Sequence, residues 1–326
     1  MDNTPPYSNL TPERVIDAVE SAGYLTDLRI YPLNSYENRV YQVGIENDEP
    51  VIVKFYRPDR WSDQQIMEEH DFSYELYDEE IPVAPPLKNN QGKTLLTFDN
   101  YRFSIYKRRS GRAPELDNLD SLHMLGRLVA RIHAIGAKKD FLVRPTLDIK
   151  TFAEDSYQFI SEHFIPRELH LPYTSLCEDI IERLKNIIEN TQTTLIRTHG
   201  DCHSGNILWR DDTPHFVDLD DSRMAPAIQD LWMFISGDRQ LQTAYINEIV
   251  EGYNEFYDFD PKQLHLIEAM RTLRIMHYSA WLARRWHDPA FPLNFPWFNT
   301  ERYWSEHILE LREQLALFNE PPLQLF

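Results

Sequence analysis

The residues best suited to chemistry lie close together in segment 199–206. The segment reads His-Gly-Asp-Cys-His-Ser-Gly-Asn, so that Asp201 precedes Asn206 by five positions. In phosphoryl transfer to an alcohol, an Asp accepts the proton of the attacking hydroxyl and an Asn at this spacing holds a magnesium ion. The segment therefore predicts a catalytic loop with Asp201 as the base and Asn206 as a metal ligand.

A second acidic group follows after a short apolar run. Phe216 and Val217 lead into Asp218, and Asp220 and Asp221 come directly afterwards. A strand that ends in a carboxylate is typical of the metal-binding element of kinases, and Mg²⁺ takes few protein ligands besides phosphate oxygens and water. We expect Asp218 to be a catalytic metal ligand. If the strand continues, Asp220 points to the same side and is a second ligand, with Asp221 a weaker candidate.

A lysine at the end of an apolar run, Lys54, is the candidate for binding the inner phosphates of ATP. Taken alone it also fits a surface lysine with a buried stem. In kinases such a lysine pairs with a helix Glu, and the helical pattern over 63–80 offers two. Glu69 follows Ile66 by three positions on the inward stripe, whereas Glu68 is rotated away by about 100°. We therefore expect a Lys54–Glu69 pair.

No glycine-rich phosphate loop precedes Lys54. The corresponding segment, 33–41, reads Leu-Asn-Ser-Tyr-Glu-Asn-Arg-Val-Tyr. Ser35, Asn38 and backbone N–H groups are its candidate phosphate contacts, and an ordinary polar hairpin explains the same residues equally well.

The elements that must position these groups fall into a β-rich part followed by a helical part. We predict an α+β, protein-kinase-like fold with two lobes: residues 1–110 as a small ATP-binding lobe and residues 111–326 as a large, mostly helical lobe for catalysis and substrate binding. A basic stretch with Gly and Pro, 107–114, marks the boundary. Strands are predicted over 38–45, 50–56, 94–98, 101–107, 195–198 and 215–219; helices are predicted over 63–80, 117–136, 151–163, 175–190, 240–257, 261–287 and 301–318.

Composition narrows the class of protein. The 326 residues carry a formal net charge of -19, which argues against nucleic acid as a partner because phosphate contacts need a basic face. No apolar run of membrane-spanning length and no signal-peptide pattern are present, so we expect a cytoplasmic protein without a membrane partner. The two cysteines, Cys177 and Cys202, do not make a disulfide framework. Cys202 fits a small filler of a tight loop better than a nucleophile.

The motif His-Gly-Asp-x-His-x-x-Asn followed by Asp-x-Asp resembles the aminoglycoside phosphotransferase and choline kinase superfamily, whose members have a protein-kinase-like fold. Within it, the chain is similar nearly end to end to a bacterial family of stress-response kinases. The segments that carry this likeness are 33–42, 53–58, 199–210, 216–221, 288–292 and 320–325.

The resemblance implies a cytoplasmic, monomeric Ser/Thr protein kinase of the stress response that uses ATP and Mg²⁺. It implies Asp201 as proton acceptor, Asn206 and Asp218 on magnesium, and Ser35 at the ATP site. The nature of the protein substrate rests on this resemblance and on nothing in the spacing of the residues.

Three other interpretations remain open on the sequence. A kinase of the same fold that phosphorylates a small molecule, such as an amino alcohol or a sugar, uses the same motifs. A metallohydrolase is conceivable if His199, Asp201 and His203 lie on one face of an extended segment and bind a transition metal. A catalytically inactive ATP-binding module would keep these residues without forming ADP.

Overall fold

The computed structural model describes residues 5–326, which form two compact units. The first unit comprises residues up to 114 together with 142–144 and 205–221, and the second comprises 115–141, 145–204 and 222–326. The segment 205–221, which contains Asn206 and Asp218, therefore belongs to the same unit as Lys54.

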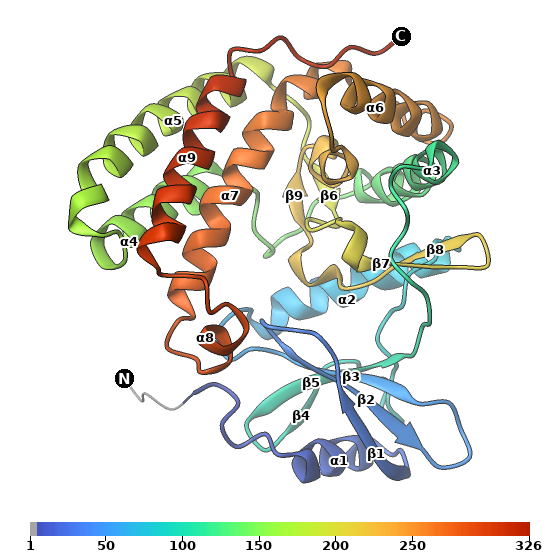
Figure 1. The fold of residues 1–326 in the computed structure, drawn as a ribbon. Helices are drawn as coiled ribbons and strands as arrows, with labels where there is room; N and C mark the ends of the chain where they lie inside the picture. The colour runs from blue at the N-terminus through green and yellow to red at the C-terminus, as the bar shows by residue number, and fades with distance from the viewer. Residues whose placement is uncertain (1–4) are drawn as a thin grey trace. The chain divides into compact units, whose positions relative to one another are not determined.

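An antiparallel sheet of five strands forms the centre of the first unit (Figure 1), in the order β1-β2-β3-β5-β4. The predicted strands of this region are confirmed, and β1 was not predicted. The strands are β1 (Thr26–Pro32), β2 (Arg39–Ile45), β3 (Val51–Phe55), β4 (Leu96–Phe98) and β5 (Tyr101–Lys107). In the central strand β3, Val53 and Phe55 join the hydrophobic core, while Lys54 points to the opposite face because side chains alternate along a strand.

Two helices belong to this unit, whereas the sequence analysis predicted only one in the first third of the chain. The helix predicted over 63–80 is α2 (Asp63–Asp78), whose start is fixed by reciprocal hydrogen bonds between Ser62 and Gln65. The second helix, α1 (Pro12–Ser21), covers the core face of the sheet (Figure 1) with Val15 and Val19.

A small hairpin completes the first unit and corrects the strand predicted over 215–219. It consists of β7 (Ile207–Arg210) and β8 (Thr213–Phe216), so the strand ends two residues before Asp218. Asp218 adopts a left-handed conformation with φ of 59°, and residues 219–221 form a 3₁₀ turn. The chain turns at Asp218, so strand alternation does not decide where Asp220 points.

The second unit is helical, as predicted, with a two-stranded sheet of β6 (Ile196–Thr198) and β9 (Arg223–Ala225). Helices α5, α7 and α9 pack together, and α3 packs against α6 (Figure 1). The helices are α3 (Leu119–Gly136), α4 (Asp155–His163), α5 (His170–Thr191), α6 (Arg239–Tyr253), α7 (Ile267–Arg284), α8 (Ala290–Asn294) and α9 (Glu301–Leu317).

Glycines set the close approach of α3 and α6. A Cβ atom on Gly126 of α3 would lie 2.1 Å from the carbonyl oxygen of Ile249. A Cβ on Gly252 of α6 would lie 2.2 Å from the carbonyl oxygen of His123. The two backbones therefore touch where side chains are absent.

Across the described residues, no helix is long and apolar enough to cross a membrane.

Candidate active site

Lys54 lies in a buried cluster of charges within the first unit. Its side chain is 7% exposed, and Nζ lies 3.3 Å from an oxygen of Asp218 and 3.3 Å from an oxygen of Asp220. Burial alone would lower the pKa of Lys54, but the nearby groups, with Asp220 first and then Tyr106 and Asp218, together outweigh it and raise this pKa well above its ordinary value. Lys54 is therefore a fixed cation.

Asp220 is the buried centre of this cluster. Its Oδ1 faces Lys54, and its Oδ2 accepts hydrogen bonds from Arg60 at 2.5 Å and from the side-chain amide of Asn38 at 3.2 Å. Burial favours the neutral acid, yet Lys54 and Arg60 hold the pKa of Asp220 at about 2. Arg60 also bonds both oxygens of Asp221, at 2.8 and 2.9 Å. Both oxygens of Asp220 are thus already engaged by protein groups.

Asp218 differs from Asp220 in its exposure. Its side chain is 50% exposed, against 4% for Asp220. The backbone N–H of Val217 donates to the carbonyl oxygen of Asn206 at 3.0 Å, which places two of the three predicted metal ligands, Asn206 and Asp218, on adjacent strand ends. Carboxylate and amide oxygens are the donors that Mg²⁺ prefers, so Asp218 and Asn206 fit this ion.

The segment before β2 is tied to the same cluster. Asn38 is 3% exposed, and its side-chain oxygen accepts the backbone N–H of Arg57 at 3.1 Å while its nitrogen donates to Asp220. The hydroxyl of Ser35 donates to the carbonyl oxygen of Asn38 at 3.1 Å. Asn38 therefore connects the segment before β2 with the chain just after β3 and with Asp220, and Ser35 closes the turn beside it.

Glu69, the expected partner of Lys54, is buried on α2 but makes no ion pair with it among the described residues. Burial raises the pKa of Glu69 to about 7, and the nearby charge of Lys54 opposes this shift. Its neighbour Glu68 accepts three backbone N–H groups of residues 142–144 at 2.5 to 2.9 Å. Glu68 thus anchors that segment to the first unit, while the role of Glu69 stays a prediction.

In the second unit, a buried aspartate fixes the backbone of the predicted catalytic loop. Asp230 accepts the backbone N–H groups of His199 at 2.7 Å and Gly200 at 2.9 Å, and its Oδ2 lies 3.0 Å from the ring of His133. Although burial favours the neutral acid, the hydrogen bond with His133 lowers the pKa of Asp230. Gly200 has φ of 85°, which favours glycine at this position. The loop is held in one conformation just before Asp201.

Asp201 contacts two other side chains of the second unit. Its Oδ1 accepts a hydrogen bond from Arg274 of α7, and its Oδ2 lies 3.5 Å from the ring of His203. The sequence analysis found neither Arg274 nor Asp230. Arg274 lies 73 positions from Asp201, and Asp230 lies about 30 positions from the loop. No rule of sequence spacing links residues so far apart, and only the packing of the helices brings them together.

Two alternative roles for loop residues do not fit the structure. Cys202 is 1% exposed, and burial raises the pKa of its thiol well above the ordinary value, so it suits the filler interpretation. Within the described chain, the one group of three side chains spaced to hold a metal is His123, Glu248 and Glu251. The full set expected for a metallohydrolase, His199, Asp201 and His203, is not such a group, although Asp201 and His203 are neighbours.

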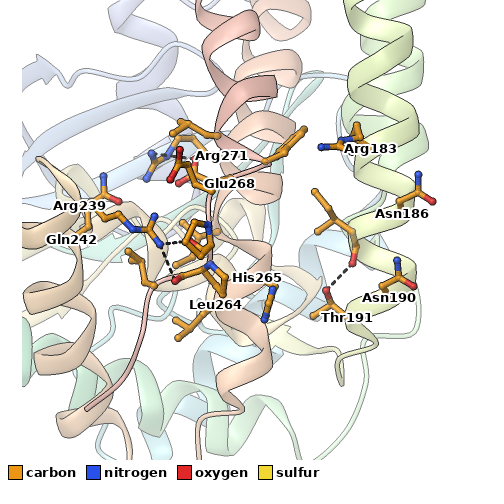
Figure 2. A pocket seen from close by; sticks show the side chains of 18 residues that line it. Arg183, Asn186, Asn190, Thr191, Arg239, Gln242, Leu264, His265, Glu268 and Arg271 are labelled. Atoms are coloured by element: carbon orange, nitrogen blue, oxygen red, sulfur yellow. Dashed lines mark hydrogen bonds and ion pairs between the residues drawn. The ribbon is translucent and has the colours of Figure 1, made fainter.

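A separate cavity of about 610 Å³ lies in the second unit, and none of the predicted site residues lines it. It is bounded by the ends of α5 and α9, the starts of α6 and α7, and the C-terminal segment (Figure 2). The arginines that line the cavity bind other groups of the protein. Arg239 donates to the carbonyl oxygens of Pro321 and Pro322, Arg183 donates to Asn319, and Arg271 forms an ion pair with Glu268. The hydrogen bonds of Arg239 at this cavity hold the C-terminal segment in place.

The first unit contains an antiparallel sheet and a lysine held by two aspartates, and the second unit is helical. A loop with an Asp and an Asn five positions apart accompanies them. Together these features are those of a phosphotransferase of the kinase type. The chain belongs to the phosphotransferase enzyme family, whose model matches residues 29–267. It is therefore an enzyme of phosphoryl transfer.

The relatives narrow this class. The chain is 44% identical over 325 residues to the serine/threonine protein kinase RdoA of Salmonella typhimurium, covering 99% of this chain and 98% of the relative. It is 43% identical over 320 residues to stress response kinase A of Escherichia coli, covering 98% and 97%. The predicted family is confirmed.

Solved structures confirm the fold. Amicoumacin kinase, solved with AMP-PNP, Ca²⁺ and its ligand, has a TM-score of 0.75 at 19% identity and covers 96% of this chain and 95% of its own. A microcompartment-associated aminopropanol kinase has a TM-score of 0.71 at 16% identity and covers 93% and 96%. The predicted α+β, kinase-like class is therefore correct.

Proposed function

We propose that this enzyme is an ATP- and Mg²⁺-dependent Ser/Thr protein kinase that acts in a stress response. The observation that carries the proposal is the buried pair of Lys54 and Asp220 with the half-exposed Asp218 beside it in the first unit, together with the loop in the second unit that carries Asp201. The relative at 44% identity is named a serine/threonine protein kinase, which supports protein hydroxyls as acceptors. We also propose that the enzyme is a cytoplasmic monomer.

The first unit would bind the nucleotide. Lys54 neutralises the inner phosphates, and Ser35 lies where the phosphate loop of other kinases would be. Asn206 and Asp218 would hold Mg²⁺, which neutralises phosphate charge when it is bound. Because both oxygens of Asp220 are engaged, we propose that it anchors Lys54 and Arg60 rather than serving as the second metal ligand that the sequence suggested. Glu69 remains the proposed partner of Lys54 when nucleotide is bound.

The second unit would activate the acceptor. The hydroxyl oxygen attacks the γ-phosphorus, its proton passes to a carboxylate oxygen of Asp201, and the bond from the γ-phosphorus to the bridging oxygen breaks to leave ADP. The backbone of the loop is already fixed by Asp230, so the base needs little rearrangement before reaction. Positioning and charge neutralisation supply most of the rate enhancement in such a step.

The proposal is tested by ADP formation with a general protein acceptor. Asp201→Asn keeps the shape of the side chain and removes the base, so we expect the rate to fall about 10²- to 10⁴-fold. Asp179→Asn, an exposed position of α5, is the matched control and should keep wild-type activity. A rate for Asp201→Asn equal to that of the control would remove Asp201 from the mechanism.

Phosphorylation of a small amino alcohol or sugar is the alternative within the same fold. The solved small-molecule kinases share less than 20% identity with this chain and indicate the fold alone, whereas the relatives at much higher identity are named protein kinases or stress response kinases. Screening such alcohols for ADP formation distinguishes the two. Turnover of one small alcohol without any protein phosphorylation would replace the proposal.

A further inference from the structure

Arg274 is an arginine that contacts the proposed base. Its Nη1 donates to Oδ1 of Asp201, and both residues belong to the second unit. On the other side of the same carboxylate, His203 lies 3.5 Å from Oδ2. An arginine carries its charge at every physiological pH, whereas a histidine does not. Arg274 is therefore the permanent positive charge at Asp201.

The position of Arg274 is set by a well-packed helix. Its neighbours Leu273 and Met276 on α7 are buried, and Arg271, one turn earlier, lies over the ring of Trp232. A side chain on such a rigid element is held more precisely than one on a loop. The side chain of Arg274 is nevertheless 41% exposed, so it remains accessible to a substrate.

Most of the hydrogen-bonding capacity of Arg274 is not used by Asp201. A guanidinium carries five N–H donors, and in the described residues one of its nitrogens, Nη1, contacts Asp201. Its remaining donors can bind the oxygens of a phosphoryl group, for which the planar guanidinium has the appropriate geometry. In phosphoryl transfer an arginine supplied within the same chain can stabilise the charge of the transition state.

We propose that Arg274 is a catalytic residue that holds Asp201 in place and neutralises charge on the phosphoryl group during its transfer. This inference rests on the proposed function, because it takes Asp201 as the base. When Asp201 accepts the proton of the hydroxyl, its charge falls from minus one to zero. The positive charge of Arg274 then loses its partner at the moment when the bond to ADP breaks and charge develops on the phosphoryl oxygens.

The opposite role, a latch that blocks Asp201 until the substrate arrives, makes the opposite prediction. Removal of a latch would raise the rate, whereas removal of a catalytic cation lowers it. The sign of the change in kcat therefore decides between the two roles.

The test compares Arg274→Gln, Arg274→Lys and Arg271→Gln. Arg271→Gln removes the same charge from α7 one turn away and should keep kcat near the wild-type value. Arg274→Gln should lower kcat about 10²- to 10³-fold, the usual effect of losing one transition-state donor, with an unchanged Kd for ATP. Arg274→Lys should recover part of the rate. Circular dichroism and Tm establish that each variant is folded.

Two further readouts separate this role from a structural one and from acceptor recognition. The slow hydrolysis of ATP, in which water is the acceptor, should fall in Arg274→Gln by the same factor as protein phosphorylation. In the double variant Asp201→Asn/Arg274→Gln, the losses should not add, because the two residues act as one unit. A loss confined to KM of the protein acceptor, or a rise in kcat, would overturn the inference.

The outcomes also distinguish failure of this inference from failure of the proposed function. An inactive Asp201→Asn with a normal Arg274→Gln defeats the role of Arg274 alone. An active Asp201→Asn defeats the proposed base and, with it, the premise on which Arg274 was assigned.

Discussion

Charge balance decides the behaviour of single residues in the first unit. Lys54, Arg60 and Asp220 are all nearly buried; Asp220 lowers the cost of burying the two cations, and they lower the cost of burying Asp220. Asp218, at the edge of the cluster, keeps half of its side chain in solvent. The carboxylates of residues 218, 220 and 221 therefore have different environments, since their side chains are 50%, 4% and 30% exposed.

Removal of Lys54 should affect stability as well as activity. In Lys54→Met, Asp220 stays buried with Arg60 and Asn38 but without its lysine, so we expect a loss of about 3 kcal/mol in the free energy of unfolding. Urea unfolding measures this change. Lys54→Met/Asp220→Leu should recover stability relative to Lys54→Met without recovering activity. A single variant as stable as wild type would show that Lys54 does not compensate Asp220.

Glu69 should make stability depend on pH. Its pKa in the folded state is about 7, above the ordinary 4.5. The protonated carboxyl therefore stabilises the fold fully below pH 4.5, and this contribution is lost as the pH rises through about 7. The difference corresponds to about 3 kcal/mol at pH 8.

Glu69→Gln removes this titration, so the variant should gain stability relative to wild type between pH 5 and pH 8. Urea unfolding at both pH values measures the gain, with the exposed Glu80→Gln as control. Parallel curves for Glu69→Gln and wild type across this range would contradict the raised pKa.

The elements show which parts of the fold can be predicted from the sequence. The capping pair Ser62 and Gln65 predicts the start of α2, and runs of β-branched residues predict β2 and β3. Helix α1 also has its signals, Thr11 as cap and Pro12 in the first turn, and could have been found. The bend at Asp218 could not, because a left-handed aspartate leaves no pattern in the neighbouring residues.

The contact of α3 with α6 depends on a position that has no room for a side chain. In Gly126→Ala the new methyl group would meet the backbone of Ile249, which cannot move aside without shifting α6. We expect a loss of at least about 2 kcal/mol in the free energy of unfolding, at the level of other overpacked sites. Because α3 also carries His133, which contacts Asp230, activity should fall too. Unchanged stability by urea unfolding would show that the helices separate easily.

For the whole molecule, local spacing predicts candidate site residues but not their partners. The motifs predict Lys54, Asp201, Asn206 and Asp218 as site residues. Partners that lie far away in the chain were missed. Arg60 and Asp220 are 160 positions apart, and Arg274 and Asp201 are 73 positions apart. Such pairs arise from the packing of strands and helices, which local patterns do not encode. The Lys54–Glu69 pair remains a prediction.

We have proposed that the enzyme phosphorylates Ser or Thr in proteins with Asp201 as its base. Mass-spectrometric mapping of phosphorylated residues, in lysate of cells that lack the enzyme, tests this most directly. Lysate supplied with wild-type protein, ATP and Mg²⁺ should gain phosphoserine or phosphothreonine sites that are absent with Asp201→Asn. ADP formation by the wild type without any new protein phosphosite would contradict the claim.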